Sequence, residues 1–200
     1  MLRRTLLPLA AALLLAVPAT ATARDEYVAK RIPLAHAAGA KAHTAQDCPN
    51  ADLVPNAGNL AAVRAAIVCL HNQIRAEHGL ARLGTDPKLR KAAVGHSADM
   101  AGRDYFDHTT PGGVTMVDRI KRSGYMRANR GWMVGENLEW GTGSLSTPRG
   151  AVKAWMNSSE HRANILRGGY RELGVGVALG TPQPGLDGGA TYTVDFGALG

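Results

Sequence analysis

The stretch LGVGVAL, residues 173–179, decides the fold class, because large and small residues alternate along it with the two-residue period of a β-strand. Its leucines and valines would form one apolar face, and the small residues between them leave a nearly bare face that lets another layer approach closely. A second alternating stretch, TYTVDF at residues 191–196, follows the Pro- and Gly-rich segment 181–189. Together they predict an antiparallel pair of strands.

Helices are predicted upstream of these strands. Apolar residues recur every three or four positions from Asn59 to Gly79, which is typical of one buried helix face. Asp86-Pro87 and Thr147-Pro148 each place a capping residue before a proline, the signal that starts a helix. The helix from Asp86 would turn His96 inward as a hydrogen-bonded core histidine.

Two shorter helices complete the expected set. One covers residues 114–123 and would point Arg119 and Arg122 outward, and the other covers residues 161–166 with Ser159 as its cap. Helices followed by a terminal antiparallel pair of strands favour an α+β domain built in layers.

The first 23 residues are typical of a secretory signal peptide. Arg3 and Arg4 precede an apolar run, and Ala21-Thr22-Ala23 forms a cleavage site, so we expect cleavage before Arg24 and a secreted, extracellular protein. An uncleaved anchor is the alternative, although the run of about a dozen residues is shorter than the roughly 20 that span a membrane. No transmembrane segment is expected elsewhere. Residues 24–58 would form a flexible leader and residues 59–200 the folded domain.

The charge balance gives a mild indication of partners. The chain has 23 basic and 16 acidic residues. Removing the signal peptide takes away two basic residues and leaves a net charge of +5. This favours contact with an anionic cell envelope, while no motif indicates nucleic-acid binding. The basic stretch from Val117 to Arg130 is expected to be a solvated helix face, and the protein a monomer.

Cys48 and Cys69 are the two cysteines of the chain. Export to an oxidising compartment predicts a disulfide between them, which would attach the leader to the first helix. A catalytic thiol is the alternative, but it would leave one cysteine without a partner.

Three polar residues are candidates for chemistry. His108 and His161 stand in polar, Gly-flanked or helix-start settings, and Glu136 follows a turn. Two imidazoles and a carboxylate can hold zinc or another divalent metal with an open coordination position. They can equally form a hydrogen-bonded polar cluster, and sequence spacing does not choose between the two.

Four segments of the chain form a recognisable set: HNQIR at 71–75, YFDHT at 105–109, GENL at 135–138 and AVKAWMNSSEHRANIL at 151–166. Together they resemble the CAP superfamily, which includes cysteine-rich secretory proteins, insect venom antigen five and plant pathogenesis-related proteins. The variant ending in HRANIL is similar to the bacterial branch.

The resemblance implies a three-layer α-β-α sandwich with a central antiparallel sheet. It also implies a surface cleft where two histidines and two glutamates converge, and His108, Glu136 and His161 match three of these positions. Ser158 stands at the fourth position, where the family usually has a glutamate. Asn137, Ser158 and Asn164 are then expected to support the cleft.

Three functions follow as hypotheses. The first is a binding protein whose cleft takes a divalent metal, a small apolar or lipid ligand, or both. The second is an extracellular hydrolase, a peptidase or esterase, that uses a metal-bound water or a serine with a histidine base. The third is a cell-envelope interaction module without catalysis. Ser158 in place of a glutamate favours binding over catalysis.

Overall fold

A computed structural model describes residues 47–127, 130–186 and 188–200 of the chain. The expected signal peptide, residues 1–23, and most of the expected leader therefore lie outside the described residues. Among the residues that are described, no helix is both long and apolar enough to cross a membrane.

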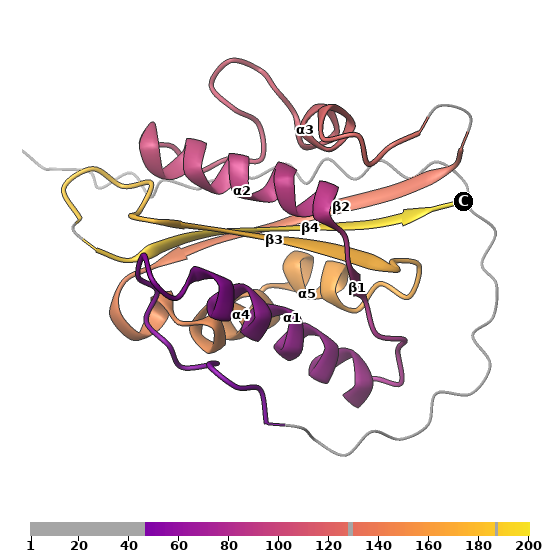
Figure 1. Ribbon diagram of the computed structural model, residues 1–200, viewed down its shortest axis with the longest axis horizontal. Coiled ribbons are helices and arrows are strands. Elements are labelled where there is room, and N and C mark those ends of the chain that lie inside the picture. The colour runs from indigo at the N-terminus through magenta and orange to yellow at the C-terminus, as the bar shows by residue number, and fades with distance from the viewer. Residues whose placement is uncertain (1–46, 128–129, 187) are drawn as a thin grey trace, which may run out of the picture.

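The described chain folds into helices on both sides of a sheet (Figure 1). The sheet has four strands in the order β1-β3-β4-β2. The elements are α1 (Leu60–Glu77), β1 (Gly84–Thr85), α2 (Pro87–Gly102), α3 (Met116–Arg122), β2 (Trp132–Gly141), the 3-10 helix η1 (Gly143–Ser146), α4 (Pro148–Asn157), α5 (Ser159–Ile165), β3 (Glu172–Leu179) and β4 (Ala190–Leu199).

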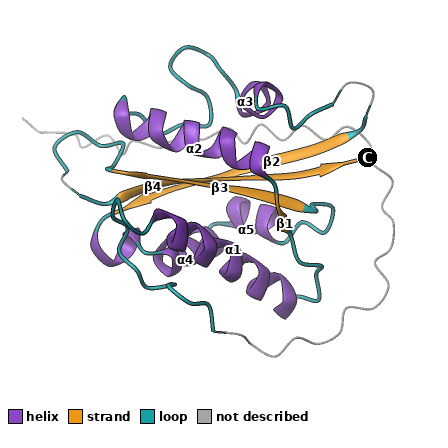
Figure 2. Ribbon diagram, in the orientation of Figure 1, coloured by secondary structure: helices purple, strands orange, loops and turns teal. Residues whose placement is uncertain are grey.

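The three-layer architecture confirms the predicted α+β fold. Figure 2 shows α2 and α3 on one face of the sheet and α1, α4 and α5 on the other. Strands β2, β4 and β3 are antiparallel neighbours, as expected. The short strand β1 was not predicted, and it pairs with β3 in parallel.

Local capping signals explain where α2 and α4 begin, whereas Asn59 at the start of α1 makes no side-chain capping bond. The side chain of Asp86 accepts hydrogen bonds from the backbone N–H groups of Lys88 and Leu89, and Thr147 accepts one from Gly150. Both predicted N-caps are confirmed, each with proline at the start of the helix. The prediction for Ser159 was wrong by one residue: Ser158 has the extended backbone of an N-cap, and Ser159 is already helical.

One face of β3 packs into the apolar core, and the other face lies close to α2, as expected. Leu173 and Val175 pack into a buried apolar cluster with α1 and α4. On the opposite face a Cβ atom at Gly174 would lie 2.1 Å from the backbone nitrogen of Arg90, and one at Gly176 would lie 2.2 Å from the carbonyl oxygen of Ala93. Helix α2 therefore lies directly on the strand backbone, which only glycine permits.

The predicted disulfide joins Cys48 to Cys69 and leaves no free thiol. The described end of the leader is packed against the domain, since the carbonyl of Ala51 accepts a hydrogen bond of 2.8 Å from the backbone of Arg149 on α4. The Cys48–Cys69 disulfide therefore attaches this segment to α1.

The polar residues of the 71–75 segment are structural. His71 is buried between the rings of Trp155 and Phe196, and burial lowers its pKa to about 4, so the ring is neutral at pH 7. Asn72 is also buried and exchanges two hydrogen bonds with the backbone of Leu83. This part of the motif holds the core together and does not reach the candidate site.

The close contact between α2 and β3 gives a first prediction. Gly176→Ala would place a methyl group against the backbone of α2, so we expect a loss of about 2 kcal/mol or more in the free energy of unfolding. Urea denaturation would measure it. Gly84→Ala is the matched control, because a Cβ there meets only one backbone oxygen at 3.9 Å. Equal stability of the two variants would contradict the packing argument.

Candidate functional site

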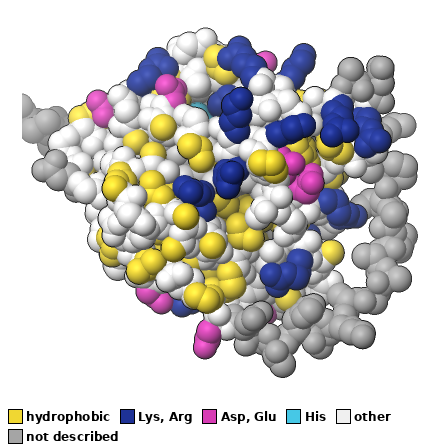
Figure 3. All heavy atoms as spheres, viewed as in Figure 1, with side chains coloured by type: hydrophobic (Ala, Val, Ile, Leu, Met, Phe, Trp, Pro, Cys, Tyr) yellow, Lys and Arg dark blue, Asp and Glu magenta, His cyan; other side chains and the backbone are white. Residues whose placement is uncertain are grey.

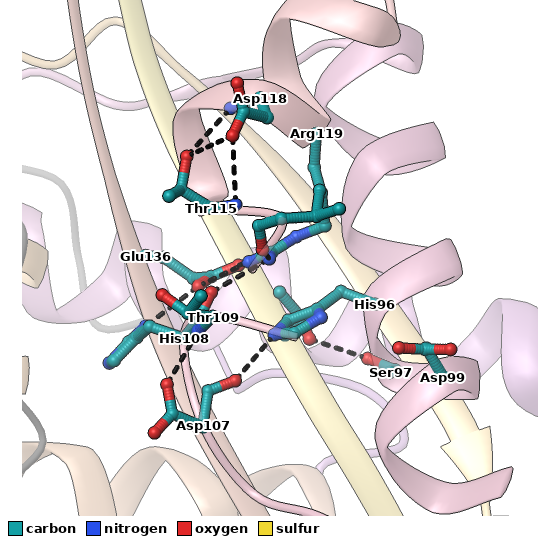
Figure 4. A network of polar contacts seen from close by, with 12 residues as sticks. His96, Ser97, Asp99, Asp107, His108, Thr109, Thr115, Asp118, Arg119 and Glu136 are labelled. Atoms are coloured by element: carbon teal, nitrogen blue, oxygen red, sulfur yellow. Dashed lines mark hydrogen bonds and ion pairs between the residues drawn. The ribbon is translucent and has the colours of Figure 1, made fainter. Parts of the chain in front are cut away.

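The site is built around Glu136, in the middle of strand β2. Its side chain is 1% exposed and points to the α2–α3 side of the sheet (Figure 4). In register it lies opposite Asp195 of β4, which in turn lies opposite Gly174 of β3. A single row across three strands therefore carries a glycine and two carboxyl groups on one face, where α2 covers them.

Arg119 of α3 provides the positive charge for this buried carboxylate. Its Nη2 donates to both Glu136 oxygens, at 2.9 and 2.7 Å, and its Nη1 donates to the carbonyl oxygen of His108 at 2.8 Å. Helix α3 begins with a capping box in which Thr115 and Asp118 each bond the other's backbone N–H. The cap fixes the first turn of the helix that carries Arg119.

The expectation that Arg119 points outward was wrong, whereas Arg122 is exposed as predicted. The Arg119 side chain is only 10% exposed. The sequence spacing could have indicated the inward orientation of Arg119. This residue follows the buried Met116 by three positions and so lies on the same helix face. An arginine was assigned to solvent because of its charge, and the sequence did not reveal that a buried carboxylate lies opposite.

His108 completes the cluster from the loop between α2 and α3. Its Nδ1 lies 2.8 Å from Glu136 Oε1, and its side chain is 13% exposed. The adjacent carbonyl of Asp107 lies 3.0 Å from Nε2 of His96, so this buried histidine of α2 holds the loop in place. His96 is therefore a hydrogen-bonded core histidine, as expected.

The electrostatics of the cluster fix Glu136 in its charged form. Burial alone would raise the pKa of Glu136, but the hydrogen bond from His108 and the positive charge of Arg119 outweigh it and hold the pKa well below the usual range. The carboxylate is therefore ionised at neutral pH. It faces Nδ1 of His108, so Nε2 is the ring nitrogen of His108 that is turned away from Glu136.

Asp195 behaves in the opposite way. It is fully buried, and neither carboxyl oxygen has a hydrogen-bond partner that meets normal geometry among the described residues. Burial and the neighbouring negative charge of Glu136 raise its pKa well above the usual range. Asp195 therefore holds its proton to higher pH than an ordinary aspartate, while Glu136 carries the negative charge that Arg119 balances. The alternating pattern of residues 191–196 indicates only that Asp195 is a polar position of a strand.

His161 lies in the other helical layer. Neighbouring residues of a strand point to opposite faces, so Asn137 faces α5 while Glu136 faces α3. Asn137 Nδ2 donates to the carbonyl of His161 at 2.9 Å, and Asn164 Nδ2 donates to Asn137 Oδ1 at 2.9 Å and to the carbonyl of Glu136 at 3.2 Å. The two asparagines attach α5 to β2. The structure thus brings His108 and Glu136 into contact, with the helix of His161 on the far side of the same strand.

Ser158, at the position where a family glutamate was expected, lies between α4 and α5. Its hydroxyl is 3.4 Å from Glu160 Oε2. This is a long hydrogen bond between neighbouring residues, and it does not give Ser158 the short contact with a base that activates a nucleophile.

The side chains around Glu136 fit a divalent metal only in part. Within residues 47–127, 130–186 and 188–200, no three His, Cys, Asp or Glu side chains are grouped as metal ligands would be. Both oxygens of Glu136 bond Arg119, so a cation at this carboxylate would meet a guanidinium. His108 is better suited, because metal-binding histidines usually donate their second ring N–H to a carboxylate. Glu136 fits the role of orienting His108 rather than that of a ligand.

Comparisons with known proteins agree with the motifs. Residues 68–196 match the profile of the cysteine-rich secretory protein family, CAP. The chain is 34% identical over 174 residues to YkwD, an uncharacterised protein of Bacillus subtilis, covering 87% of this chain and 58% of that protein. It is 37% identical over 111 residues to YlbC, an uncharacterised membrane protein of the same bacterium, covering 56% of this chain and 30% of that one. The chain thus spans less than two thirds of both relatives.

Two solved structures have a similar fold. One is an extracellular protein containing an SCP domain from Bacillus anthracis, with a TM-score of 0.52 and 34% identity, covering 65% of this chain and 38% of that one. The other is an outer surface protein from Borrelia burgdorferi, with a TM-score of 0.54 and 21% identity, covering 66% and 88%. The second likeness concerns the fold alone.

Removing Arg119 tests its role in the cluster. Arg119→Met would leave the Glu136 carboxylate buried without its counter-charge, so we expect a loss of about 3–5 kcal/mol in the free energy of unfolding at neutral pH. The double variant Arg119→Met/Glu136→Gln should recover part of this loss. Arg122→Met, an exposed arginine of the same helix, serves as the control. A single variant as stable as the control in urea denaturation would rule out the proposed dependence.

Asp195→Asn tests the buried proton. In the folded protein Asp195 keeps its proton at pH values where an unfolded aspartate has lost it, so its contribution to stability falls as pH rises above about 4. The asparagine variant lacks this titration. We therefore expect the stability of Asp195→Asn relative to the wild type to increase as the pH is raised from about 4. Thermal denaturation across this range would measure the difference, with the exposed Asp104→Asn as control; parallel curves for wild type and Asp195→Asn would contradict the prediction.

Proposed function

Because the chain belongs to the cysteine-rich secretory protein (CAP) family, we propose that it acts outside the cell as a binding protein and not as an enzyme. The observation that carries this proposal is the state of Glu136, which is buried, ionised and bonded to both Arg119 and His108. A general base needs access to its substrate and a pKa near the working pH. Glu136 has neither, so its role is to orient His108.

An extracellular location is part of the proposal. The Cys48–Cys69 disulfide is typical of exported proteins, and the Bacillus anthracis structure is described as extracellular. We retain residues 1–23 as the signal peptide that would direct export.

The binding site we propose is a cleft at the edge strand β2, with His108 on one side of the strand and the helix of His161 on the other. His108 is held in one orientation by Glu136, and Asn137 and Asn164 hold the helix that carries His161. Fixed polar groups of this kind orient a ligand, and its apolar portion supplies most of the buried area. A small apolar or lipid ligand fits this arrangement.

A divalent metal such as zinc is the second ligand proposed for this cleft. His108 would hold it through Nε2 and His161 through its ring, with Glu136 orienting His108. The nearby charge of Arg119 opposes tight binding, so the affinity should be modest. When bound, such an ion would supply a Lewis-acidic contact for a ligand carboxylate or carbonyl.

A cell-envelope interaction without catalysis is favoured by a specific observation. Residues 87–130 contain nine basic and four acidic residues. Figure 3 shows Lys and Arg side chains gathered on the surface of the molecule over α2 and α3. Retention on isolated envelopes, and release by salt, would separate this alternative from recognition of a small ligand.

The proposal predicts zinc uptake without hydrolysis. In a background with the tail histidines His36 and His43 replaced, calorimetric titration should give saturable zinc binding that His108→Ala weakens by at least about tenfold. His78→Ala, at the exposed end of α1, should bind as the parent does. Peptidase, esterase and peptidoglycan substrates should show the same background rate with the parent, His108→Ala and His161→Ala. Turnover that depends on either histidine would refute the non-catalytic proposal, and equal zinc binding in all variants would refute the metal site.

A further inference from the structure

A small groove lies between α2 and α3, apart from the cleft around β2. The groove is open to solvent and has a volume of about 220 Å³. Lys91, Ala92, Gly95 and His96 of α2 line it from one side, and Arg119 and Arg122 of α3 from the other. The walls are mostly apolar, because long basic side chains place their methylene stems along the groove and their charged ends at its rim.

Gly95 leaves this part of the α2 surface bare at a cost to its own helix. It lies in the interior of α2, where glycine is less favourable than alanine. A Cβ atom at this position would meet nothing within 4 Å, and the backbone does not have the positive φ that would require glycine. Neither packing nor backbone geometry explains the residue. Gly174 and Gly176 differ, since there a Cβ atom would strike α2.

Positive charge exceeds negative charge around the groove, although Asp118 of α3 lies near Arg122 of the same helix. Lys91 and Arg122 are exposed, and neither forms a salt bridge or side-chain hydrogen bond with another described residue. Arg119 gives its Nη atoms to Glu136 and to carbonyl groups, but its buried Nε has no hydrogen-bond partner among these residues. The groove thus joins an apolar wall to an excess of positive charge.

We propose that this groove binds a small anionic amphiphile, with a carboxylate or phosphate group between Lys91 and Arg122 and its apolar part against Ala92 and Gly95. The volume sets the size of the ligand, since pockets for drug-sized molecules measure about 300–1,000 Å³. A short-chain acid or one end of a longer molecule fits, and a whole lipid does not. The inference does not depend on the cleft around β2, because Lys91, Gly95 and Arg122 lie outside it.

Hexanoate and hexyl phosphate are the probes, titrated into the exported protein and followed by amide chemical shifts. We expect saturable shifts at Ala92 and Gly95 with one or both probes, and binding at least about tenfold weaker for hexanol and for inorganic phosphate. The tighter of the two probes identifies the head group. Equal binding of inorganic phosphate would indicate non-specific charge attraction and would overturn the proposal, as would the absence of saturation.

Two variants separate shape from charge. Gly95→Leu fills the groove without changing charge, and Lys91→Gln/Arg122→Gln removes charge without filling it; each should weaken hexanoate binding by at least about tenfold. Gly95→Ala is a milder version that should keep the fold, as thermal denaturation would verify. Gly102→Leu at the end of α2 and Lys153→Gln on α4 are the matched controls and should bind normally. Undiminished binding in Gly95→Leu would place the ligand elsewhere and refute the groove.

Discussion

Arg119 and Glu136 form the ion pair on which the α2–α3 side of the domain depends. The carboxylate is almost completely buried, and a buried charge without a partner is costly. Arg119 supplies the opposite charge with two hydrogen bonds from Nη2 and uses Nη1 to hold the carbonyl of His108. One guanidinium thus joins α3, strand β2 and the loop that carries the histidine, so the position of each depends on the other two.

The burial of this pair follows from glycine on the neighbouring strands. Gly174 and Gly176 allow the backbone of α2 to lie directly on β3, and α2 then covers Asp195 and Glu136 in the same face of the sheet. Without Arg119, two carboxyl groups in that position would both favour the protonated form. With it, the pKa of Glu136 falls below its usual range, while the pKa of the buried Asp195 beside that negative charge is raised.

This arrangement shapes what the domain can do. The chain belongs to the CAP family and has its fold. A fold does not define a function, because different sites can be built on the same fold. In this chain the glutamate nearest His108 is committed to a structural ion pair, and a serine stands where a second glutamate was expected. Both features favour recognition over catalysis. The groove between α2 and α3, which Arg119 also lines, is the separate place that we propose for a small anionic amphiphile.

The sequence by itself determined the helix starts at Asp86 and Thr147, the alternating strands, the layered α+β class and the disulfide, because capping, strand alternation and cysteine pairing in an exported chain depend on local residues or on compartment. It also identified His108 and Glu136 as candidates. Only the tertiary structure decided that Arg119 points inward, that Asp195 lies beside Glu136, and that the helix of His161 lies across the strand from them. The physical reason is that a buried charge is stable only beside its partner, and that partner comes from a distant segment which the fold alone brings near.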